Sequence, residues 1–343
     1  MEGEPHLDEL AIQDDCPNFG CGSNSPVVGW PPFHELDEGP PADGGAARSA
    51  RPGPLDDDEF DQGGAFNGEG LRVVHIRSGF NHYRLDVEGD RLRALDEDGD
   101  VALEGEDLET SVIVLEKEDG TRFDVFIERF SNSLTFWVGD EDPIETFNLT
   151  WVNATEPGPR QPVCPLPAAY DEWGPVSHEA IFFQGDRYDA VTKDVIATGD
   201  EARGWFNVAC AGSATAKMHT NRHTTAGASG DYTASEDDRQ ALLKMFVADY
   251  CGTGTAFTEV GEPLRWQNSD DWQLLDLDDP IIYEAVWDST GALCLDTPRM
   301  GDSKAEILET IDAIEGVCDR PPRCTPLQLA SWKTRGYLLT ANP

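Results

Sequence analysis

Residues 111–130, SVIVLEKEDGTRFDVFIERF, decide how the first half of this chain folds. Phe123, Val125 and Ile127 alternate with polar residues, which is the period of a strand with one buried face. Asp119 and Gly120 form the Asp-Gly pair that favours the positive φ angles of a tight hairpin turn. The stretch therefore predicts two antiparallel strands joined by the turn EDGT.

The same alternation extends to both sides of this hairpin. It appears in YRLDVEG at residues 83–89, in SLTFWVG at 133–139 and in ETFNLTWVN at 145–153. Turn residues separate these runs, and no helical pattern interrupts them. We therefore expect residues 65–160 to form an N-terminal antiparallel β-sandwich or barrel domain.

Two short segments precede the predicted β-domain. Residues 1–38 contain Cys16 and Cys21, which are close enough to form a small disulfide ring, and we expect this segment to be a docking element on a neighbouring sheet. Residues 39–64 are dense in Pro, Gly, Ala and Asp and have little to bury. They predict a flexible linker, and we expect residues 35–64 to bury little surface and to be the most protease-sensitive interior stretch.

The pattern changes after residue 160. Residues 205–219, WFNVACAGSATAKMH, are rich in small residues and predict a helix. Ser235 and Asp238 resemble a capping box before a second helix, which Gly252 ends. A hairpin at DSTG and a helix from SKAEILETIDAIEGVC follow. We therefore expect residues 161–343 to be a disulfide-bearing α+β domain with a central helical hairpin, which makes the chain α+β overall.

The balance of charge restricts the partners of this protein. Its 343 residues include 66 acids and 25 Lys and Arg, a net charge of −41. We expect no nucleic-acid partner, because phosphate binding needs clustered positive charge. We also expect no transmembrane segment, because no run of about eighteen apolar residues is present.

The cysteines favour an oxidising compartment. The chain has eight of them, an even number spread along its length, which is typical of exported proteins. The first residues show no signal peptide. We give the cysteines more weight and expect an extracellular, periplasmic or cell-envelope location, with an envelope or extracellular protein as a candidate partner.

Short separations predict two of the disulfide bonds. Cys16 with Cys21 and Cys318 with Cys324 lie only a few residues apart, and prolines stiffen the second loop. We therefore expect both pairs to be bonded.

Cys251 follows the second predicted helix, where the helix dipole opposes a thiolate. We interpret it as a structural cysteine. Its partner is Cys210 or Cys294, and we favour Cys210 because two consecutive antiparallel helices bring these positions together. Cys164 takes the cysteine that is left.

His219 and His223 have the i, i+4 spacing of two metal ligands on one helix face. They are the candidate metal ligands, although no Glu stands between them and two ligands do not complete a site. The alternative is a helix end at which these side chains make hydrogen bonds. We favour this alternative.

The run LDEDGDVALEGED resembles the start of an EF-hand loop, with acids at Asp96, Asp98 and Asp100. Val101 replaces the required Gly and Asp107 replaces the final Glu. We therefore expect an acidic hairpin turn. We predict no cofactor, and loose calcium or zinc binding stays open.

The tetrapeptide Ala248–Asp249–Tyr250–Cys251, with the surrounding residues 204–266, resembles the ADYC-domain proteins of myxobacteria and related bacteria. The resemblance implies a bacterial, often exported protein that contains cysteines. No catalytic residue carries over from it. Asp249 and Tyr250 become the candidate functional corner.

These observations favour an exported or cell-envelope protein that is a binding or structural module without catalytic activity. The alternative is a hydrolase that uses His219, His223 and Cys251 in the helical hairpin, with or without a metal. A disulfide at Cys251 would remove the thiol mechanism.

Overall fold

The computed structural model describes the larger part of the chain, namely residues 33–39, 61–140, 142–156, 158–164, 179–258, 264–270, 272, 281–299, 304–313, 321–334 and 338–342. Most of the regular structure in these residues is antiparallel sheet, with a few short helices. None of the described helices is long and apolar enough to span a membrane.

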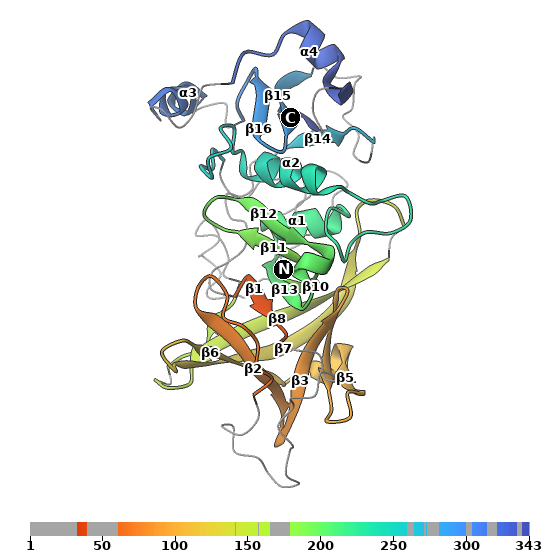
Figure 1. The fold of residues 1–343 in the computed structure, drawn as a ribbon, viewed down its shortest axis with the longest axis vertical. Coiled ribbons are helices and arrows are strands. Elements are labelled where there is room, and N and C mark those ends of the chain that lie inside the picture. The colour runs from red at the N-terminus through yellow and green to blue at the C-terminus, as the bar shows by residue number, and fades with distance from the viewer. Residues whose placement is uncertain are drawn as a thin grey trace, which may run out of the picture.

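The largest element is an eleven-stranded antiparallel sheet (Figure 1). Its strand order is β1-β13-β10-β8-β7-β6-β2-β3-β4-β5, with β9 paired to β8. The strands are β1 Glu35–Asp37, β2 Leu71–Ser78, β3 Asn81–Glu88, β4 Arg91–Leu95, β5 Val101–Glu104, β6 Val112–Lys117, β7 Arg122–Thr135, β8 Pro143–Asn153, β9 Gln161–Pro162, β10 Glu179–Gln184 and β13 Trp205–Cys210.

The predicted hairpin at residues 111–130 is confirmed as β6 and β7. The two strands pair from Val112 with Phe126 to Glu116 with Arg122. At the turn, Gly120 has φ 84°, and the Asp119 carboxylate accepts the Thr121 N–H at 2.9 Å. The Asp-Gly pair therefore acts as the sequence pattern predicted.

The large sheet curls around its own apolar core. β1 contacts β2, and β10 contacts β3 and β4, although these strands are far apart in the strand order. Phe147 and Phe182 pack edge to face inside the curl, with ring centroids 5.4 Å apart. A large antiparallel sheet with a buried face is what the alternating sequence predicts, and it fits a sandwich.

The sheet includes strands from both sides of the predicted boundary at residues 160 and 161. Ala180 of β10 pairs with Phe147 of β8, and β13 pairs with β10. Gly39 and Gly64 lie at the ends of the predicted linker and pack closely, since a Cβ on Gly39 would meet the Gly64 nitrogen at 2.9 Å. Residues 40–60 lie outside the described residues, and the domain division stays a prediction.

One predicted helix is wrong over half of its length. Residues 205–210 form strand β13, and α1, Ala214–Thr220, begins only after the Ser213 N-cap. Five of the six β13 residues are buried, because Phe206 faces the core inside the curl while Ala209 faces the helices. A strand buried on both faces loses the period of two, which is why its sequence resembles a helix.

The second helix is confirmed as α2, Glu236–Val247. The Ser235 hydroxyl accepts the Asp238 N–H at 3.2 Å, and the Asp238 carboxylate accepts the Ser235 N–H at 3.0 Å. These two bonds form the predicted capping box. α1 contacts α2, and both helices lie between the large sheet and the C-terminal part of the chain (Figure 1).

The C-terminal part is a four-stranded sheet in the order β14-β17-β15-β16. The hairpin predicted at DSTG is present as β15 and β16. Two helices accompany this sheet, and a separate two-stranded sheet, β11 with β12, lies beside α2. The remaining elements are β11 Asp186–Asp189, β12 Asp194–Thr198, β14 Arg265–Asn268, β15 Ile282–Asp288, β16 Gly291–Leu295, α3 Lys304–Ala313, α4 Pro326–Ala330 and β17 Leu338–Asn342.

Candidate functional site

The candidate corner begins where α2 ends. Ala248 takes the left-handed conformation, with φ 53° and ψ 43°, and its N–H donates to the last carbonyls of the helix. This reversal turns the following three residues toward different neighbours. The contacts that each residue makes therefore show its structural role.

Asp249 is fully buried, and its carboxylate closes the loop after the helix. Oδ1 accepts the Thr253 N–H at 3.0 Å, and Oδ2 accepts the Gly254 N–H at 2.7 Å. Lys244 of α2 donates to Oδ2 at 3.0 Å. A carboxylate that is held by two backbone amides and one ammonium group is a structural anchor.

Tyr250 connects the corner to the C-terminal sheet. Its hydroxyl donates to Glu284 Oε1 of β15 at 2.6 Å, and its ring stacks on Trp287 with centroids 5.2 Å apart. Arg299 donates to both oxygens of Glu284, at 2.5 and 2.9 Å. All three polar residues are buried, and burial raises the pKa of Tyr250 well above its ordinary value. We call Tyr250, Glu284 and Arg299 the brace.

Cys251 and Gly252 complete the corner. Cys251 is disulfide-bonded, as the structural interpretation requires, and its partner lies outside the described residues. Gly252 has φ 67°, and a Cβ added to it would meet the Thr290 carbonyl oxygen at 1.9 Å. The corner therefore lies against the β15–β16 turn, backbone to backbone.

The favoured pairing of Cys210 with Cys251 is wrong. Cys210 is bonded to Cys164, with Cα atoms 5.3 Å apart. Side chains alternate along a strand, and Cys210 of β13 faces the core inside the curled sheet, whereas Cys251 packs against the cluster around α2. The helical interpretation of residues 205–210 had concealed this alternation.

The predicted bond between Cys318 and Cys324 is also wrong, because Cys324 pairs with Cys294 of β16 at a Cα separation of 4.9 Å. Both of these cysteines are buried in the cluster on the outer face of the C-terminal sheet. The prediction used the short separation along the chain. The observed bond instead joins two cysteines that lie 30 residues apart and that the fold brings together. Cys16 and Cys21, predicted to be bonded, lie outside the described residues.

The two histidines do not share a helix face. α1 ends at Thr220, and Arg222 has φ 63°, so His223 lies beyond the helix. His219 Nδ1 lies 2.9 Å from Thr224 Oγ1, and its Nε2 lies 3.4 Å from Asp90 Oδ2.

His223 Nδ1 donates to the Asn221 carbonyl at 2.6 Å. Burial lowers the pKa of His223 to about 4, so this imidazole is neutral near pH 7. Over the part of the chain that the structure describes, no three His, Cys, Asp or Glu side chains converge as metal ligands would.

The acidic run after β4 forms a hairpin turn, as expected. Asp96 Oδ1 accepts the N–H groups of Asp98 and Asp100, each at 3.0 Å. β4 and β5 pair on either side of it. The first carboxylate of the calcium-like run is thus used to shape the turn.

An open groove of about 690 Å³ lies close to His219 and was not predicted from the sequence. We call it the polar groove. It is formed by the β3–β4 turn, the β10–β11 junction, the loop after β12 and the loop after α1. Its lining residues are Gly89, Gln184, Gly185, Gly199, Asp200, Arg203, Thr225 and Ala226.

One wall of the polar groove rests on a buried ion pair. Thr225 donates its N–H and its hydroxyl to the two oxygens of Asp186, at 2.7 and 2.8 Å. Arg239 of α2 donates to the same carboxylate at 2.8 Å. Burial raises the pKa of Asp186 to about 6, against the opposing effect of Arg239.

A second buried carboxylate, Glu38, holds the lining residue Gln184. Glu38 accepts the Val87 N–H at 2.9 Å and the Gln184 amide at 3.2 Å. Burial raises the pKa of Glu38 to about 8. Two buried carboxylates with raised pKa values therefore hold lining residues of the polar groove.

The sequence contained only a faint signal for this groove. Gly-Asp-Arg occurs at residues 89–91 and again at 185–187, and the first Gly of each lines the groove. The groove residues come from four separate segments, so only the tertiary structure brings them together.

The fold and the site define a sheet-rich protein with disulfide bonds, in which the corner after α2 lies against the C-terminal sheet and a separate polar groove lies near the start of α2. The family model for the ADYC domain matches residues 105–301, which is more than half of the chain. The chain therefore belongs to the ADYC-domain family. The match extends well beyond the resemblance at residues 204–266 and covers most of the large sheet. Neither the curated proteins nor the solved structures include a match to this chain.

Proposed function

We propose that this protein is an exported or cell-envelope binding module without catalytic activity, and that it binds a polar ligand in the polar groove. The observation that carries the proposal is that two side chains of the corner, Asp249 and Cys251, are used in structural contacts. Asp249 anchors a loop, and Cys251 is bonded to another cysteine. A sulfur atom in a disulfide is not a nucleophile.

The disulfide bonds support the location. Cys164–Cys210 fixes the curled sheet, and Cys294–Cys324 fixes the C-terminal sheet. Such bonds persist in oxidising compartments and are rare in cytosol. An exported protein whose two sheets each carry a disulfide bond is suited to present a stable binding surface outside the cell.

The polar groove supports the binding role. Its lining combines the Gln184 amide, the Asp200–Arg203 ion pair and the backbone of three glycines. A Cβ on Gly89 or Gly199 would meet no atom within 4 Å, so the backbone at both positions is open to a ligand. Its volume of about 690 Å³ lies within the range of small-molecule sites, which is roughly 300–1,000 Å³.

The experiment compares two tyrosine variants by ligand-observed NMR against soluble fragments of bacterial envelope polysaccharide. Ala226→Tyr places a large side chain in the groove without changing the network around Asp186. Ala102→Tyr places the same side chain on the exposed strand β5 as the control. We expect the wild type and Ala102→Tyr to bind a fragment and Ala226→Tyr to lose binding. Equal binding by both variants would refute the proposal that the polar groove is the binding site.

The hydrolase alternative is tested separately. Generic ester, amide and phosphoester substrates are incubated with wild-type protein and with His223→Ala. We expect no turnover above background for either protein. Turnover by the wild type that His223→Ala abolishes would overturn the proposal of a module without catalytic activity.

A further inference from the structure

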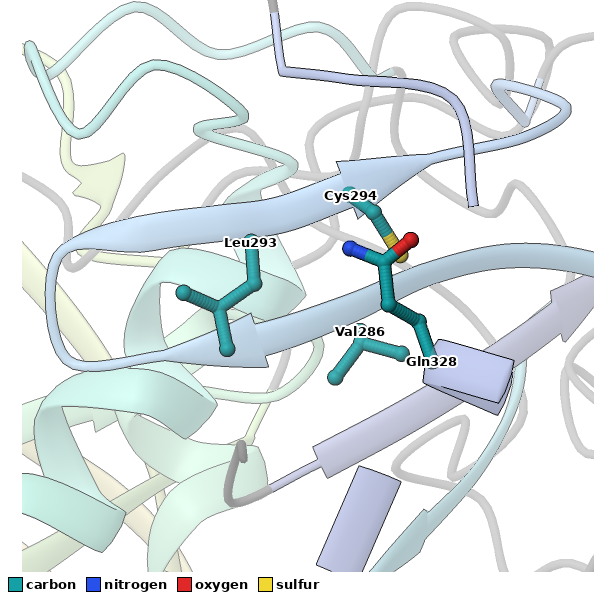
Figure 2. A pocket seen from close by; sticks show the side chains of 4 residues that line it. All are labelled: Val286, Leu293, Cys294 and Gln328. Atoms are coloured by element: carbon teal, nitrogen blue, oxygen red, sulfur yellow. The ribbon is translucent and has the colours of Figure 1, made fainter. Parts of the chain in front are cut away.

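A second, apolar pocket lies on the outer face of the C-terminal sheet (Figure 2). Its volume is about 300 Å³, and it is lined by Val286 of β15, Leu293 and Cys294 of β16, and Gln328 of α4. Among the described residues, no charged side chain belongs to this lining. We call it the apolar pocket, and it is separate from the polar groove in position and in chemistry.

The walls of the apolar pocket are fixed in place. The Cys294–Cys324 bond ties the segment before α4 to β16. Val286 and Cys294 belong to a buried cluster with Trp332 and Leu339 beneath them. The pocket is therefore preformed, which lowers the entropy cost of binding.

Gln328 presents a single polar group to this apolar surface. Its side-chain oxygen accepts the Thr325 N–H and the Thr325 hydroxyl, each at 2.9 Å, in the capping box of α4. The amide orientation is therefore set by the helix cap. The Gln328 nitrogen points to the Leu293 side of the pocket (Figure 2), and within the described residues it has no hydrogen-bond partner.

We propose that the apolar pocket binds a small uncharged ligand that combines a branched apolar group with a carbonyl oxygen. The apolar group fills the space over Val286 and Leu293, and the carbonyl accepts a hydrogen bond from the Gln328 amide. A charged ligand would lose its hydration, and the described lining residues offer it no opposite charge. The volume is at the lower end of the range for ligand sites, so the ligand is about the size of one capped amino acid.

The probe is N-acetyl-leucinamide, which has an isobutyl group and neutral amide carbonyls. Its binding is measured on the whole chain from the methyl NMR signals of Val286 and Leu293. We expect saturable shifts with a dissociation constant of about 1–10 mM, as is usual for a ligand of this size. N-acetyl-glycinamide, which lacks the isobutyl group, should bind at least about tenfold more weakly.

Three variants test the assignment. Gln328→Glu keeps the capping oxygen but removes the N–H donor, and we expect it to weaken binding about tenfold. Leu293→Trp should abolish binding because it fills the pocket. Leu327→Ser, an exposed neighbour outside the lining, should bind like the wild type.

Two results would overturn the proposal. One is the absence of methyl shifts in the wild type at 50 mM probe, about five times the weakest expected dissociation constant. The other is unchanged binding in both Gln328→Glu and Leu293→Trp. If Gln328→Glu disturbs the Trp332 indole signal, Gln328→Met replaces it as a variant without the donor. Ala226→Tyr should leave probe binding unchanged, so failure of the polar groove is distinguished from failure of this pocket.

Discussion

Gly252, directly after the ADYC tetrapeptide, lets the corner lie against the β15–β16 turn. Its φ of 67° is unfavourable for any residue with a side chain, and a Cβ there would meet the Thr290 carbonyl oxygen at 1.9 Å. Gly252→Ala therefore has two costs, a backbone cost and a steric cost. Gly89→Ala separates them, because Gly89 has φ 66° and a Cβ there would meet no atom within 4 Å.

The expected magnitudes follow from this difference. An alanine in the left-handed region costs about 1–2 kcal/mol, which is the whole expected effect for Gly89→Ala. At Gly252 the backbone of the corner and the turn must also move apart by more than 1 Å, and overpacking of a buried region adds about 1–3 kcal/mol. We therefore expect Gly252→Ala to lower the free energy of unfolding by about 2–5 kcal/mol.

The assay is urea-induced unfolding under oxidising conditions, followed by tryptophan fluorescence. The reasoning requires the loss for Gly252→Ala to exceed that for Gly89→Ala by at least about 1 kcal/mol. Equal losses for the two variants would refute it, since both have the same backbone cost. The close approach of the corner to Thr290 would then add no measurable steric cost to the free energy of unfolding.

Three further changes test the brace, the disulfide and the pH response. Glu284→Gln should destabilise the protein by about 3–5 kcal/mol in urea unfolding, because it removes the buried carboxylate that faces the Arg299 charge. Cys251→Ser should cost about 2–4 kcal/mol under oxidising conditions and nothing in excess reductant, as measured by thermal unfolding with and without dithiothreitol. Glu38 has a pKa raised from 4.5 to about 8, so the folded state holds its proton more tightly than the unfolded state. Its contribution to the free energy of unfolding must therefore fall as pH rises from about 4.5 to about 8. Urea unfolding at pH 5 and pH 8 should show that Glu38→Gln becomes more stable relative to the wild type at the higher pH.

Local sequence patterns predicted the parts of the fold that depend on local physics. The Asp-Gly turn at residues 119–120 and the Ser235 capping box lie where the sequence places them, because both are fixed by neighbours within a few residues. β13 was interpreted as a helix because burial on both faces removed the alternation that identifies a strand. Tertiary contacts overrode the local pattern there.

The disulfide bonds and the polar groove also depend on tertiary contacts that local sequence patterns do not reveal. The prediction for Cys210 depended on an assumed helix, and the real strand turns this residue toward Cys164. The polar groove combines Gln184 and Thr225 with turns that lie far away in the sequence. Neither feature has a spacing rule, so both needed the three-dimensional structure.

The ADYC tetrapeptide is explained by folding alone. Ala248 ends the helix, Asp249 closes the loop, Tyr250 reaches the brace and Cys251 forms a disulfide. The family match ends at residue 301, just beyond Arg299, which completes the brace.

The matched unit therefore contains the strands of the large sheet from β6 onward, the corner and its attachment to the C-terminal sheet. In this motif Asp249 closes a loop and Tyr250 attaches the corner to the C-terminal sheet, which is evidence for a shared architecture. For the proposed ligand, the place to test first is the polar groove, whose lining residues Thr225 and Gln184 are held by Asp186 and Glu38.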